Sequence, residues 1–231
     1  GDKELIDDPR WRGYDVPPKS NANYGWILNM VSKLGENGVA GFILANGALS
    51  GGGEEYKIRR KLIENNLVEA ILVLPRNLFY TTDISVTLWI VNKNKQAHNR
   101  QIANETRSYR DREKEILFMD LRQMGEPFEK KYTQFSDADI QKVANTYHQW
   151  QIQQIENIPE FCYSASFEEV AKKDFSLVPS KYIEFVNRDE NINFDEKMQS
   201  LKNEFAELLK AEEQSKADLL NVFKELGYEI R

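Results

Sequence analysis

Hydrophobic positions in the first part of the chain switch between two spacings. From Tyr24 to Leu34 they recur every three or four residues, as on one face of an amphipathic helix. Residues 39–45, VAGFILA, are continuously apolar, which is typical of a strand buried on both faces of a parallel sheet. A short helix predicted over 54–66 and an apolar strand over 67–74 repeat the alternation. The pattern therefore predicts an α/β fold.

A third strand is predicted over residues 84–91, a run rich in β-branched and aromatic side chains. Only the nine residues 75–83 separate it from the strand before. Since this connection is too short for a helical crossover, the third strand should run antiparallel to its predecessor. The connection holds Phe79 and Tyr80 side by side. Adjacent residues of an extended segment point to opposite sides, so at most one ring should join the core.

The composition changes after residue 95. Residues 96–114 are polar and charged without an apolar period, which predicts a surface loop or linker that ends a first domain of residues 1–95. Residues 115–192 contain a strand pattern at 115–121 and two helix patterns that begin with serine caps, and they predict a mixed α/β extension.

Residues 193–231 are predicted to form a long helix, because apolar residues recur from Phe194 to Leu226 with alternating spacings of four and three. The polar residues Glu212 and Ser215 interrupt this seam, so a helical hairpin broken there is the alternative. A single helix of this length exceeds a small domain, which predicts packing against another chain. The positions predicted to face that partner are Leu201, Phe205, Leu208, Leu219, Val222 and Leu226.

Composition excludes several classes of protein. The sequence has no apolar run of roughly 20 residues that could cross a membrane. The single cysteine, Cys162, excludes an internal disulfide and favours a reducing compartment such as the cytoplasm. Because Cys162, His98 and His148 are the only cysteine and histidine residues of the sequence, no metal site is expected. The net charge of −6 indicates that any contact with nucleic acid phosphates depends mainly on a partner.

Three ordered blocks of sequence carry a family resemblance. Residues 21–95, which begin NANYGWILNMVSKLGENGVAGFILANGALSGGG, resemble the modification (M) subunit of type I restriction-modification systems. The stretches LFMDLRQMGEPFEKKYTQFSDADIQKVANTYHQW and EFCYSASFEEVAKKDFSLVPSKYIEF resemble the same family downstream. The resemblance implies part of a Rossmann-like methyltransferase sheet with an antiparallel final strand, followed by a mainly helical C-terminal region.

The same resemblance implies transfer of a methyl group from S-adenosylmethionine to the N6 atom of adenine in DNA. Its implied partners are a specificity subunit, a restriction subunit and double-stranded DNA bound through the complex. The rival interpretation is a non-catalytic scaffold in which residues 115–231 only hold two proteins together.

Two motifs of the family are missing from this sequence. It has no glycine-rich cofactor turn after a first strand, and Pro17-Pro18 follows Val16 rather than the asparagine of an Asn-Pro-Pro-Phe motif. The resemblance therefore implies a C-terminal portion, without catalytic residues and inactive alone, whose cofactor is bound mainly by a preceding N-terminal part. The absence of an initiator methionine agrees with a processed chain or an excised fragment.

The resemblance also assigns candidate site residues. It implies that Phe79 or Tyr80 stacks on an adenine flipped from the duplex; the alternative is that both rings pack beneath the strands. Asn46 ends the strand 39–45 at the edge where α/β folds bind ligands, so it is a candidate site wall or a turn residue. Gly51–Gly53 favours a turn over a phosphate loop, and the basic cluster Arg59–Lys61 favours a solvated helix face over DNA contact.

Overall fold

The computed structural model describes residues 5–186 and 194–228. The chain divides into two compact units, Gly1–Phe185 and Val186–Arg231. Residues 187–193 and 229–231, which include the predicted start and end of the last helix, lie outside the described residues. Within the described ranges, no helix combines the length and the apolar character that crossing a membrane requires.

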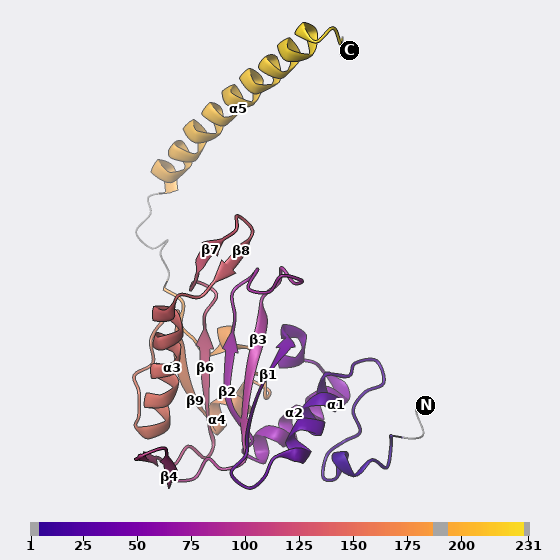
Figure 1. Ribbon diagram of the computed structural model, residues 1–231, viewed down its shortest axis with the longest axis vertical. Helices are drawn as coiled ribbons and strands as arrows, with labels where there is room; N and C mark the ends of the chain where they lie inside the picture. The colour runs from indigo at the N-terminus through magenta and orange to yellow at the C-terminus, as the bar shows by residue number, and fades with distance from the viewer. Residues whose placement is uncertain (1–4, 187–193, 229–231) are drawn as a thin grey trace. The chain divides into compact units, whose positions relative to one another are not determined.

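A five-stranded mixed sheet organises the first unit (Figure 1). Its strands lie in the order β1 (Val39–Ala45), β3 (Val86–Asn92), β2 (Val68–Val73), β6 (Glu115–Asp120) and β9 (Cys162–Ser166). Strand β3 runs antiparallel to both β1 and β2, which confirms the direction predicted from the short connection. Strands β2 and β6 are parallel, and β9 is antiparallel to β6.

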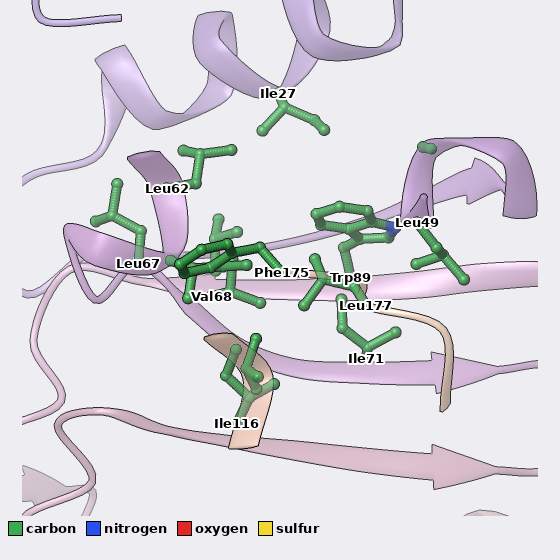
Figure 2. Close-up of a cluster of buried hydrophobic side chains, with 14 of the residues drawn as sticks. Ile27, Leu49, Leu62, Leu67, Val68, Ile71, Trp89, Ile116, Phe175 and Leu177 are labelled. Atoms are coloured by element: carbon green, nitrogen blue, oxygen red, sulfur yellow. The ribbon is translucent and has the colours of Figure 1, made fainter. Parts of the chain in front are cut away.

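Helices cover both faces of this sheet. Helices α1 (Asn23–Lys33) and α2 (Gly53–Glu64) bury their apolar residues in one core, where Figure 2 shows Ile27 and Leu62 beside sheet residues that include Trp89. Helix α3 (Asp137–Ile152) contributes Trp150 to the core on the other face. The short elements are α4 (Phe167–Lys172) and the 3₁₀ helices η1 (Pro9–Trp11), η2 (Asn46–Leu49) and η3 (Pro179–Lys181).

Strand β1 differs from the prediction of burial on both faces. Ala40, Phe42 and Leu44 are partly buried against the core of α1 and α2. Val39 and Ile43 point to the other face and are 47% and 46% exposed. The difference arises because β1 is the edge strand of the described sheet and the described helices cover only one of its faces.

Residues 96–114 are not the predicted loop or linker. They form a hairpin of β4 (His98–Ile102) and β5 (Glu105–Tyr109). Polar pairs hold its two strands without an apolar period, for example Ser108 Oγ, which donates to Asn99 Oδ1 at 2.8 Å. A buried Arg112 follows the hairpin.

The predicted division of the chain at residues 95 and 115 is also wrong. Strands β6 and β9 lie in the same sheet as β1, β2 and β3, so residues 115–185 belong to the first unit. A second hairpin, β7 (Glu126–Phe128) with β8 (Tyr132–Gln134), lies within residues 115–192, for which a mixture of helices and strands was predicted.

The second unit contains one continuous helix, α5 (Phe194–Glu225), of 32 residues. This continuity excludes the alternative of a helical hairpin broken between Glu212 and Ser215. None of the residues of α5 is buried. Within the described residues of the second unit, the apolar seam predicted along the helix is therefore uncovered.

Candidate functional site

The carboxyl ends of β1 and β2 meet at one edge of the sheet, because both strands run antiparallel to β3. Ligands of open α/β folds bind outside this edge. Three segments lie there: residues 46–53 after β1, residues 74–85 between β2 and β3, and the β7–β8 hairpin (Figure 1). Below, residues 74–85 are called the β2–β3 loop.

The two neighbouring rings of the β2–β3 loop are both accessible. A tight turn, in which Thr82 N donates to Phe79 O at 3.2 Å, presents them. Phe79 is 37% exposed and Tyr80 is 71% exposed, so the alternative that both rings pack beneath the strands is wrong. Tyr80 makes an edge-on contact with Tyr132 of β8, with 4.9 Å between ring centroids.

Asn46 lies at the same edge, directly after β1, with its side chain oriented by β3. The buried Thr87 hydroxyl donates to Asn46 Oδ1 at 2.5 Å. Asn46 itself is exposed. With the amide oxygen engaged, its two N–H donors are the groups that remain for a ligand.

Hydrogen bonds from buried side chains hold the turn around the glycine segment 51–53. Tyr24 Oη donates to Ala48 O at 2.6 Å, and burial raises the pKa of this phenol to about 12. Arg59 Nη1 donates to Gly51 O at 2.7 Å. Gly53 has φ of +59°, a conformation that glycine adopts without strain.

The prediction that Arg59 lies on a solvated helix face is wrong. The side chain is buried, so it does not face DNA either. It is 2% exposed, and its Nε donates to Phe175 O at 2.8 Å. The sequence carries no signal for this role, because the acceptors are backbone carbonyls and one of them, Phe175 O, comes from a distant segment.

The structure also reveals a hollow that the sequence analysis missed. It has a volume of about 620 Å³ and lies between the β2–β3 loop and the β7–β8 hairpin. Four basic side chains and one acidic side chain line it: Arg76, Arg122, Lys130, Lys131 and Glu126. Below, it is called the basic hollow. The adjacent pair Lys130-Lys131 is the only feature of the sequence that could have indicated it.

A family model described as "N-6 DNA Methylase" matches residues 1–191. The chain belongs to the N-6 DNA methylase family. It is 37% identical to the type I restriction enzyme HindI methylase subunit of Haemophilus influenzae, an alignment that covers 98% of this chain and 48% of the relative. It is 31% identical to the MjaIX methylase subunit of Methanocaldococcus jannaschii, over 96% of this chain and 39% of the relative.

Solved structures of proteins from type I restriction-modification systems share the fold. The methyltransferase subunit of a Streptococcus thermophilus type I restriction-modification system superposes with a TM-score of 0.65 at 29% identity. That match covers 78% of this chain and 34% of the other. The EcoKI M protein superposes with a TM-score of 0.54 at 19% identity, over 83% of this chain and 44% of the other. The chain thus spans less than half the length of each of these relatives.

Proposed function

We propose that this chain is the C-terminal portion of the adenine-N6 DNA methyltransferase subunit of a type I restriction-modification system. The observation that carries the proposal is the 37% identity to a type I methylase subunit along 98% of the chain. The placement of β3 between β1 and β2, antiparallel to both, supports a Rossmann-like methyltransferase sheet. The full subunit would methylate adenine N6 in double-stranded DNA.

S-adenosylmethionine would supply the methyl group, and we assign its binding mainly to residues that precede those of this chain. The described residues at the sheet edge fit the base better than the cofactor. They offer two aromatic rings and the N–H donors of Asn46, which suit stacking and hydrogen bonding of a planar heterocycle. This portion alone is expected to be inactive.

The β2–β3 loop would hold the target adenine outside the duplex. An enzyme that modifies a base must extract it from the stack and bind it in a pocket. Phe79 is the preferred stacking face, because the contact of Tyr80 with Tyr132 already engages the second ring. Asn46 would form a wall of the pocket and donate to a ring nitrogen of the base.

Helix α5 would dock this portion into the complex. Its apolar seam is exposed along the whole described helix, and Leu219 and Leu226 are 56% and 66% exposed. A seam of this length is more apolar surface than an isolated helix leaves in water. The proposed partner is a helical part of the specificity subunit, with the restriction subunit joining the same cytoplasmic assembly.

The rival scaffold function receives little support from the fold. It required residues 115–231 to act as a module of their own, whereas β6 and β9 complete the sheet that carries the β2–β3 loop. Only α5 is a separate unit that could serve assembly alone.

The test is methylation of duplex DNA by the full-length subunit assembled with its specificity subunit. Phe79→Ala and Tyr80→Ala are compared with Ile84→Ala, which truncates an apolar side chain of the same loop that is 54% exposed. Loss of one stacking contact weakens base binding by about 1–3 kcal/mol, so the methylation rate should fall about 5- to 150-fold for the stacking residue. Duplex binding should stay unchanged. Wild-type rates for both ring variants would refute the base-pocket assignment.

A further inference from the structure

The charge of the basic hollow is opposite in sign to the net charge of the whole chain. Its lining residues carry four positive charges and one negative charge, whereas the whole chain carries a net charge of −6. Glu126 is the only carboxylate in the lining. Such a local reversal of sign attracts an anion to this place on the surface.

The hairpin that forms one wall is fixed against the β2–β3 loop. Thr133 N donates to Asn77 O at 3.0 Å, and the ring of Tyr132 contacts that of Tyr80. Gly125, where the chain enters the hairpin, has φ of +94°. A Cβ atom there would lie 2.7 Å from Thr133 Cγ2, so a side chain would push the hairpin away from its position. The hollow and the proposed base pocket therefore share one boundary.

The tip of the hairpin adopts a conformation that non-glycine residues avoid. Glu129 and Lys130 have φ of 48° and 61°. Each left-handed non-glycine residue costs roughly 1–2 kcal/mol. A contact from Lys131 N to Glu129 O at 2.7 Å closes the turn. The result places two adjacent, exposed lysines beside the hollow.

Three of the four cations are not neutralised by a carboxylate. Arg122 is paired, because its Nη2 lies 2.6 Å from Asp120 Oδ2. In the described part of the chain, Lys130, Lys131 and Arg76 have no carboxylate within ion-pair distance. Arg76 Nε donates to a backbone carbonyl at 3.1 Å, and Lys131 Nζ lies over the ring of Tyr132 at 5.6 Å. Most of the N–H donors of these three side chains are therefore available to an external anion.

We propose that the basic hollow binds backbone phosphates of the DNA strand that carries the target base. This inference rests on the proposed function. A base that rotates out of the duplex stays attached to its own phosphates, so the groups that hold those phosphates must lie beside the base pocket. The hollow meets this requirement through the Tyr80–Tyr132 contact, and its Lys and Arg groups have the chemistry that binds phosphate oxygens without reading sequence.

The experiment measures DNA affinity of the full-length subunit assembled with its specificity subunit, at a series of salt concentrations. The test variant is Lys130→Gln with Lys131→Gln. The matched control is Lys57→Gln with Lys61→Gln, which removes the same charge from the exposed face of α2. Each lost phosphate contact reduces the slope of log affinity against log salt by about 0.9, so the test variant should lose about 2 from this slope. The loss should be equal on target and non-target duplexes.

Two results would overturn the inference: a slope unchanged from wild type, or an equal loss in the control pair. Arg76→Gln gives an independent measurement, with an expected slope loss of about 1. Failure of the proposed function is distinguishable, because then the wild-type complex itself would not methylate DNA. Since the substituted lysines are exposed, circular dichroism should show the same fold for every variant.

Discussion

Removal of Arg112 should destabilise the first unit strongly, because this side chain neutralises a buried carboxylate. Arg112 Nε lies 3.1 Å from Glu69 Oε1 of β2, and the two side chains are 1% and 0% exposed. Asn92 Nδ2 and Gln151 Nε2 also donate to this carboxylate, at 2.6 and 3.3 Å. Of the three donors only Arg112 carries a charge. Lys95 Nζ donates to two backbone carbonyls instead.

The expected loss in the free energy of unfolding depends on the buried Glu69 charge, which Arg112→Met leaves without its charged partner. Loss of one partner of a buried ion pair costs about 3–5 kcal/mol, because the other charge stays buried. Two amide donors and the nearby Lys95 charge remain, so we expect the lower end, about 3 kcal/mol. Glu69→Leu should cost a similar amount. The double variant should lose much less than the sum, because an apolar pair leaves no uncompensated charge.

Urea unfolding followed by circular dichroism measures these changes. At slopes of about 1–3 kcal/mol per molar urea, a loss of 3 kcal/mol lowers the midpoint by about 1–3 M. The control is Arg60→Met, which breaks the exposed pair with Glu64 and should cost about 0.5 kcal/mol or less. Equal midpoints for Arg112→Met and Arg60→Met would refute the reasoning. Additive losses in the double variant would show that Glu69 and Arg112 are not coupled.

Two further predictions concern assembly and pH. Leu219→Ala with Leu226→Ala should abolish co-purification with the specificity subunit while helical content is retained. The control Lys216→Ala, which lies outside the seam, should leave co-purification unchanged. If the double variant still forms the complex, α5 is not part of the interface. Burial lowers the pKa of Lys95 from 10.5 to about 8. Between these two pH values the unfolded chain binds more protons than the folded chain. The free energy of unfolding should therefore rise with pH by up to about 3 kcal/mol relative to that of Lys95→Met. If the free energies of unfolding of the two proteins change in parallel with pH, this prediction is wrong.

Local features of the sequence determined much of the fold. The spacing of apolar residues located α1, β1, α2 and β2, because helices and strands repeat with different periods. The length of one connection fixed the direction of β3. A serine cap predicted the start of α3, where the side chains of Ser136 and Asp139 form a capping box. These signals act between residues that are close in sequence, so they can be recognised before the fold is known.

Tertiary structure alone decided the roles of the charged and polar residues. Arg59 and Arg112 resembled surface residues in sequence, yet each is buried by partners that include segments more than 40 residues away. The polar stretch 96–114 gave no periodic signal, because its hairpin is held by polar cross-strand pairs. The hairpin of Lys130 and Lys131 lies beside Tyr80 only because β2 and β6 are parallel neighbours that end at one edge. Such contacts depend on the order of strands in the sheet, which spacing along the chain does not specify.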